Sequence, residues 1–206
     1  MLNAVLIHSG VAGTENYFKD CAEVRYRIER IGDPWSPDFA GDDLVIVPNG
    51  ANHVALYDAR AAIHALLAHG GVLACFCGFF TPWIPGSLWR HDNTKPLQDV
   101  RYRLNRDDLA LFDGVEVNEL TFDAHGISGW WACGHIETAH ADNVVLIDNF
   151  ERVLLIADRR STKGLIIATA SGPLGDPDPS SPAQGTCLLY RNILRAARTH
   201  LEAVHA

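Results

Sequence analysis

The chain has 206 residues, of which 48% are hydrophobic and 20% charged, so it can bury one substantial core, and we expect a single domain over residues 1–206. Its formal net charge of −8, with lysines and arginines that form no run, disfavours nucleic acid as a partner. No apolar run reaches the ~20 residues that a membrane span needs, and the first residues lack a signal-peptide pattern, so we expect a cytoplasmic protein without a membrane partner.

The first segments predict a strand, a short helix and another strand. Residues 4–7 are a short apolar run, which is typical of a buried strand. Residues 14–23 predict a short helix with Thr14 as its cap, and residues 24–31 alternate apolar and charged side chains as a half-buried strand does. The alternative is one continuous helix over residues 14–30.

A strand, a helix and a strand are predicted next. Residues 44–47 form a buried strand that ends at Pro48. Residues 54–69 carry apolar side chains at helical spacing and stop at two glycines, after which a third buried strand begins at Val72. This order indicates parallel strands joined by a right-handed crossover.

The rest of the chain is rich in strand candidates. Residues 79–95 hold prolines and tryptophans without a clean period, which predicts a long surface loop. Five strand candidates follow in close succession: 114–122, 127–135, 143–149, 152–160 and 163–172. Most of them leave no room for crossover helices, so this block is antiparallel or mixed. Residues 186–204 form a closing amphipathic helix. We therefore predict an α/β fold, with a flavodoxin-like, mostly parallel sheet flanked by helices and an additional β-rich portion.

Polar residues follow the predicted parallel strands. Ligands of such sheets bind beyond the carboxyl ends of the strands. Four segments occupy those ends, and they are residues 8–10, 49–53, 77–78 and 169–172. The five cysteines are an odd number spread thinly over the chain, so they form no disulfide framework, and each is a candidate for core filler, metal ligand or nucleophile.

These segments resemble a known superfamily. The sequences "AVLIHSG", "DDLVIVPNG", "HALLAHGGVLACFCG" and "KGLIIATASGP" are similar to the class I glutamine amidotransferase-like superfamily, and most similar to its trehalose-utilisation (ThuA-like) branch. The resemblance implies that Cys77 stands at the nucleophile position and that Gly50 and Ala51 supply backbone N–H groups for an oxyanion. The superfamily also uses a His-x-Glu after a late strand. The matching place here, residues 168–176, holds no histidine, and the one His-x-Glu of the chain, His135 with Glu137, lies earlier in the sequence. A catalytic triad is defined by geometry rather than by sequence order, so this motif is the candidate.

The sequence leaves two functions open. The first is a cysteine-dependent hydrolase or acyl transferase with Cys77, His135 and Glu137 as catalytic residues. The second is an inactive domain of the same fold that binds a small, sugar-like molecule or serves in assembly. The residues expected to contact a ligand lie at the strand ends or in the loop after Cys77: His8, Gly50, Ala51, Asn52, Gly78, Trp83 and Trp89.

Metal and nucleotide sites are disfavoured. A zinc site could be formed by Cys75 and Cys77 together with Cys133 and His135, or with His91. These residues lack the C-x2-4-C spacing of structural zinc sites. Cys75 is better explained as core filler. The glycines do not follow a dinucleotide or phosphate-loop pattern, so we expect no cofactor. Exposed edges of the β-rich portion are compatible with a homo-oligomer.

Overall fold

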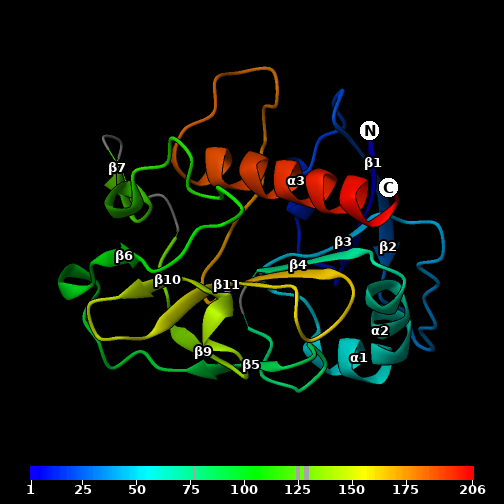
Figure 1. Ribbon diagram of the computed structural model, residues 1–206, viewed down its shortest axis with the longest axis horizontal. Helices are drawn as coiled ribbons and strands as arrows, with labels where there is room; N and C mark the ends of the chain where they lie inside the picture. The colour runs from blue at the N-terminus through cyan, green and yellow to red at the C-terminus, as the bar shows by residue number, and fades with distance from the viewer. Residues whose placement is uncertain (77, 124–125, 128–129) are drawn as a thin grey trace.

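A computed structural model describes residues 1–76, 78–123, 126–127 and 130–206 (Figure 1). Its strands are β1 (Leu2–His8), β2 (Val24–Arg30), β3 (Leu44–Val47), β4 (Val72–Phe76), β5 (Ser87–His91), β6 (Tyr102–Leu104), β7 (Phe122–Asp123), β8 (Gly126–Ile127), β9 (Gly134–Thr138), β10 (Val144–Asp148), β11 (Val153–Asp158) and β12 (Leu165–Thr169). Its helices are α1 (His53–Asp58), α2 (Arg60–Ala68) and α3 (Gly185–Val204), with short 3-10 turns η1 (Thr14–Tyr17), η2 (Leu97–Asp99), η3 (Val117–Glu119) and η4 (Ala141–Asn143).

The main sheet has eight strands in the order β2-β1-β3-β4-β12-β11-β10-β6 among the described residues. The first five of these strands are parallel to one another, and β11, β10 and β6 continue the sheet in antiparallel pairs. The parallel part has the strand order of flavodoxin-like folds, with β12 in the fifth place. The predicted fold class, a mostly parallel α/β sheet with an additional β-rich portion, is confirmed.

Helices and a small second sheet cover the two faces of the main sheet. In Figure 1, α3 crosses one face, while α1 and α2 lie on the opposite side together with the β5–β9 pair. Tyr190 of α3 packs edge-on against Phe76 of β4, with ring centroids 6.2 Å apart. Because both faces are covered, every residue of β3, β4 and β12 is buried, which explains their unbroken apolar runs.

Two predicted helices differ from those in the structure. Residues 14–23 give only η1, because Phe18 leaves the helical conformation and buries its ring against Tyr26 and Tyr190. The following strand, β2, is confirmed, and the alternative of one helix over residues 14–30 is wrong. The helix predicted over 54–69 is divided at Ala59 into α1 and α2.

The loop and strands predicted in the middle of the chain also need correction. The segment 79–95 contains β5, which pairs with β9, a partner more than forty residues further along the chain. Where a strand is predicted over residues 114–122, the structure has the 3-10 turn η3 and the start of the short strand β7. Where a strand is predicted over residues 127–135, the described residues contain only the end of β8 and the start of β9. None of the described helices is long and apolar enough to cross a membrane.

Candidate functional site

The carboxyl ends of four neighbouring parallel strands form one edge of the sheet. Strands β1, β3, β4 and β12 lie side by side and run in the same direction, so the loops that follow them meet at this edge. The switch in strand order falls between β1 and β3, the position where open α/β sheets bind ligands. We call the edge formed by the loops after β1, β3 and β4 the strand-end site.

The loops after β1 and β3 are bonded to each other. The backbone N–H of Asn52 donates to Ser9 Oγ at 2.8 Å, and a Cβ on Gly50 would lie 3.3 Å from the Val11 side chain. The Asn52 side chain caps α1 by accepting from two backbone N–H groups, and the Ala51 N–H donates to the Pro48 carbonyl at 3.3 Å. Asn52 and Ala51, both predicted to contact a ligand, therefore use these groups to shape the loop.

His8, at the end of β1, is held by the protein's own polar groups. Its Nδ1 accepts from the Gly10 N–H at 3.0 Å and lies 3.1 Å from the Arg30 guanidinium, while its Nε2 lies 3.2 Å from a carboxylate oxygen of Glu15. Glu15 also pairs with Arg30 at 3.1 Å. The His8 ring thus ties the first loop to η1 and β2.

His53, the first residue of α1, is a buried histidine at the strand-end site. The ring is buried, and its Nδ1 accepts a hydrogen bond from Trp83 Nε1 at 3.2 Å. Since an indole N–H is only a donor, a neutral His53 ring must carry its proton on Nε2. A Cβ built on Gly78 would lie 3.3 Å from this Nε2, so the donor nitrogen faces the backbone that follows β4.

Phe80 adds an exposed aromatic surface beside His53. The two rings contact edge to face, with centroids 5.8 Å apart, and 56% of Phe80 is exposed. The adjacent Thr81 fixes this loop by donating from its hydroxyl to the His53 carbonyl at 2.7 Å. A hydrogen-bond donor and an apolar face therefore lie next to each other at the strand-end site.

The two tryptophans predicted to contact a ligand are buried, Trp83 in the loop after β4 and Trp89 on strand β5. Trp83 has no exposed surface, and its indole serves to hold His53. Trp89 is 8% exposed and packs against Gly134 of β9, where an added Cβ would come within 2.6 Å of the indole. Both rings therefore pack within the core and are not exposed for stacking on a ligand.

The His-x-Glu motif lies on β9, in the small β5–β9 sheet. His135 is half-buried opposite Arg90 of β5, and the carboxylate of Glu137 is exposed and accepts from Arg90 Nε at 3.0 Å. The structure thus brings His53, Gly78 and Trp83 together at the strand-end site and places His135 and Glu137 on β9 of the small sheet.

Of the cysteines at positions 75 and 77, the structure describes only Cys75, on β4. Cys77, the predicted nucleophile, lies outside the described residues. Cys75 is fully buried, and burial raises the pKa of its thiol well above the ordinary value, so Cys75 fills the core as predicted. Among the described residues, no group of three or more His, Cys, Asp or Glu side chains is arranged to hold a metal ion.

His53 is predicted only as the last residue of the strand-end segment 49–53, and Phe80 is not among the residues predicted to contact a ligand. The signal for His53 was its position directly after the cap residue Asn52, which starts a helix at the edge of the sheet. Its contacts with Trp83 and Gly78 bridge about 25 to 30 positions along the chain, which local patterns do not encode.

The architecture defines an α/β domain of flavodoxin-like strand order. No family model matches the chain, and no curated protein matches it. Solved structures do resemble it, among them a cytoplasmic protein from Salmonella typhimurium, at 12% identity and a TM-score of 0.56, covering 95% of this chain and 98% of that one.

A protein described as ThuA-like, from Parabacteroides merdae, is similar at 11% identity and a TM-score of 0.53, with 96% of this chain and 90% of that chain covered. A β-galactosidase from Rahnella sp. R3 is similar at 13% identity and a TM-score of 0.54, but the match covers 98% of this chain and only 31% of the enzyme. At such identities the likeness concerns the fold alone. The chain has a ThuA-like fold.

Proposed function

We propose that the chain binds a small, sugar-like molecule at the strand-end site, with His53 as the central hydrogen-bond donor. The observation that carries the proposal is the hydrogen bond from Trp83 to His53 Nδ1, because it places the one N–H proton of a neutral His53 ring on Nε2, beside the backbone after β4. A donor fixed in this way suits a hydroxyl or carboxylate oxygen of a ligand.

The neighbouring ring of Phe80 supports a sugar rather than a simple anion. Sugars combine polar hydroxyls with apolar ring faces, and an aromatic ring stacks on those faces while a fixed donor sets their orientation. Phe80 supplies the exposed aromatic surface and His53 the donor. The position of the site at the switch between β1 and β3 agrees with the general location of ligands in such sheets.

Ligand titrations followed by NMR test this proposal. Glucose represents a neutral polyol and acetate a carboxylate, and we expect glucose to shift the ring signals of His53. Phe80→Ala should lose this response, and His53→Gln should lose the shift that glucose causes in the backbone amide signal of Gly78. His69→Gln, at the exposed end of α2, and Phe150→Ala, an exposed ring elsewhere, should keep it. A response to acetate alone would reassign the ligand as a carboxylate, and no response to either would refute the proposal.

Thiol chemistry at Cys77 is the second candidate, and the closeness of His53 to Gly78 favours it because Cys77 precedes Gly78 in the chain. A Cys77 thiolate would attack an acyl carbon and expel the leaving group, and water would then hydrolyse the thioester to release the acid and restore the thiol. With Nδ1 accepting from Trp83, His53 would donate from Nε2 to the thiolate and lower the pKa of the thiol, rather than take its proton.

Alkylation by a haloacetamide, followed by mass spectrometry of each cysteine, tests the second candidate. We expect Cys77 to react faster than a simple thiol at neutral pH, with buried Cys75 as the unreactive internal reference. His53→Gln should slow the reaction of Cys77. A rate no greater than that of a simple thiol would rule out an activated Cys77 and leave the binding function alone.

Membership of the glutamine amidotransferase-like superfamily and a cytoplasmic location are part of the same proposal. The strand order of the parallel sheet supports the first. The Salmonella typhimurium neighbour, which is described as a cytoplasmic protein, supports the second.

A further inference from the structure

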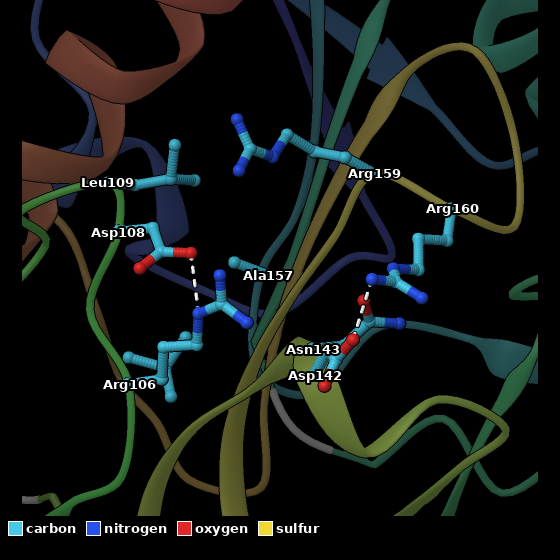
Figure 2. Close-up of a pocket in the computed structure, with 9 residues that line it drawn as sticks. Arg106, Asp108, Leu109, Asp142, Asn143, Ala157, Arg159 and Arg160 are labelled. Carbon is cyan, nitrogen blue, oxygen red and sulfur yellow. Dashed lines mark ion pairs between the residues drawn. The ribbon is translucent and has the colours of Figure 1, made fainter.

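A cavity of about 260 Å³ lies at the opposite edge of the sheet (Figure 2). The turn after β11 and the residues just before β10 border it, and these segments lie at the end where the parallel strands begin. Its polar lining consists of Arg106, Asp108, Asp142, Asn143, Arg159 and Arg160. The cavity is therefore separate from the strand-end site.

Positive charge predominates in this cavity. Arg106 pairs with Asp108 at 2.6 Å, and Arg160 pairs with Asp142 at 2.6 Å, as the dashed lines in Figure 2 mark. Arg159 forms no ion pair with any residue in the described part of the chain. The three guanidinium groups thus leave one positive charge that the lining carboxylates do not balance.

Asn143 provides a second and independent sign of a ligand. The residue is only 3% exposed and lines the cavity, and its Nδ2 has no hydrogen-bond partner within the described residues. Burying an amide donor without a partner costs about 1–3 kcal/mol. An acceptor atom in the cavity would satisfy this donor.

The turn that carries two of the arginines is held rigidly. The carboxylate of Asp158, which is 1% exposed, accepts from the backbone N–H groups of Arg160 and Ser161 at 2.7 and 3.0 Å and from the Ser161 hydroxyl at 2.5 Å. These bonds satisfy Asp158 within the turn. The backbone from which Arg159 and Arg160 project is therefore fixed before any ligand arrives.

We propose that this cavity binds a phosphate group, either free or carried by a small molecule. Arginine forks match phosphate oxygens in paired hydrogen bonds, and a phosphate has enough acceptor sites for several guanidinium groups together with the Asn143 amide. Arg159 supplies the unbalanced charge, while Asp142 and Asp108 orient Arg160 and Arg106. A cavity of about 260 Å³ has room for a phosphate group.

Calorimetric titration of the full chain with inorganic phosphate and with glucose 6-phosphate tests the proposal. Sodium chloride at matched ionic strength is the control for screening. We expect phosphate to bind and Arg159→Gln to weaken its binding roughly tenfold or more, since a hydrogen bond between charged groups contributes at least that factor. Arg25→Gln, which removes an exposed arginine from β2 that is likewise unpaired among the described residues, should leave binding unchanged.

Two further variants separate a built site from general attraction to a positive surface. Arg160→Gln should weaken phosphate binding, whereas Arg103→Gln should not. The two variants are matched because Arg103 and Arg160 have nearly equal side-chain exposure (58% and 59%) and each pairs with one carboxylate. Asn143→Asp, which keeps the shape and replaces the donor by a carboxylate, should also weaken it. Stronger binding of glucose 6-phosphate than of phosphate would identify a phosphorylated metabolite, and the reverse a free phosphate. No heat beyond the chloride control, or equal losses in Arg25→Gln and Arg159→Gln, would overturn the proposal.

Discussion

Replacing Gly78 by alanine probes the contact between the strand-end backbone and His53. Gly78 has a φ of +80°, where an L-residue is strained by about 1–2 kcal/mol. The added Cβ would also lie 3.3 Å from His53 Nε2, so the ring or the loop must move. Inserting a methyl group into a packed region costs typically about 1–3 kcal/mol. We therefore expect Gly78→Ala to lower the free energy of unfolding by about 2–5 kcal/mol, the sum of the two costs.

Gly41→Ala is the matched control for the same backbone strain. Gly41 has a φ of +85°, and an alanine Cβ there would meet no atom within 4 Å. Its cost should be limited to the conformational part, about 1–2 kcal/mol. Urea unfolding with unchanged m-values measures both free energies. If Gly78→Ala were no more destabilising than Gly41→Ala, the placement of His53 against Gly78 would be wrong.

Three other parts of the structure give further predictions. Asn52→Ala removes the cap of α1 and should lower the free energy of unfolding by about 1 kcal/mol in urea titrations, with no loss contradicting the cap. Asp148→Asn breaks the buried ion pair with Arg152 (2.7 Å) and should cost roughly 3–5 kcal/mol by the same assay; a cost under about 1 kcal/mol would refute the importance of the pair. The side-chain and backbone hydrogen bonds from Thr94 lower the pKa of Asp92 from 3.8 to about 2, so the stability from Asp92 is present above about pH 4 and is lost as the pH falls toward 2. Thr94→Val should raise this pKa in an NMR titration, and an unchanged pKa would show that the hydroxyl is not its main cause.

The parallel sheet could be predicted because its strands are buried on both faces. Strands β1, β3, β4 and β12 appear in the sequence as short apolar runs that end in polar residues, and the periodic residues of α3 mark an amphipathic helix. The same runs placed polar residues at one edge of the sheet. Sequence patterns alone were sufficient there since the local signal and the tertiary burial agree.

The parts that could not be predicted depend on contacts between distant segments. Strand β5 exists because β9 pairs with it, and the segment after Thr14 is mostly non-helical because Phe18 is drawn into the core against Tyr190. The sequence predicts that polar residues lie at the carboxyl ends of the parallel strands, but it does not predict the hydrogen bonds that these residues form. His8 is held by Glu15 and its neighbours.

The tautomer and ligand response of the His53 ring test the central claim most directly. In a long-range ¹⁵N correlation spectrum at a pH where the ring is neutral, we predict a proton on Nε2, with Nδ1 unprotonated as the acceptor from Trp83. Addition of glucose should shift the Nε2 signal, and Trp83→Phe should abolish the fixed tautomer. A ring protonated on Nδ1, or an Nε2 signal that neither glucose nor acetate shifts, would contradict a binding site built on this histidine.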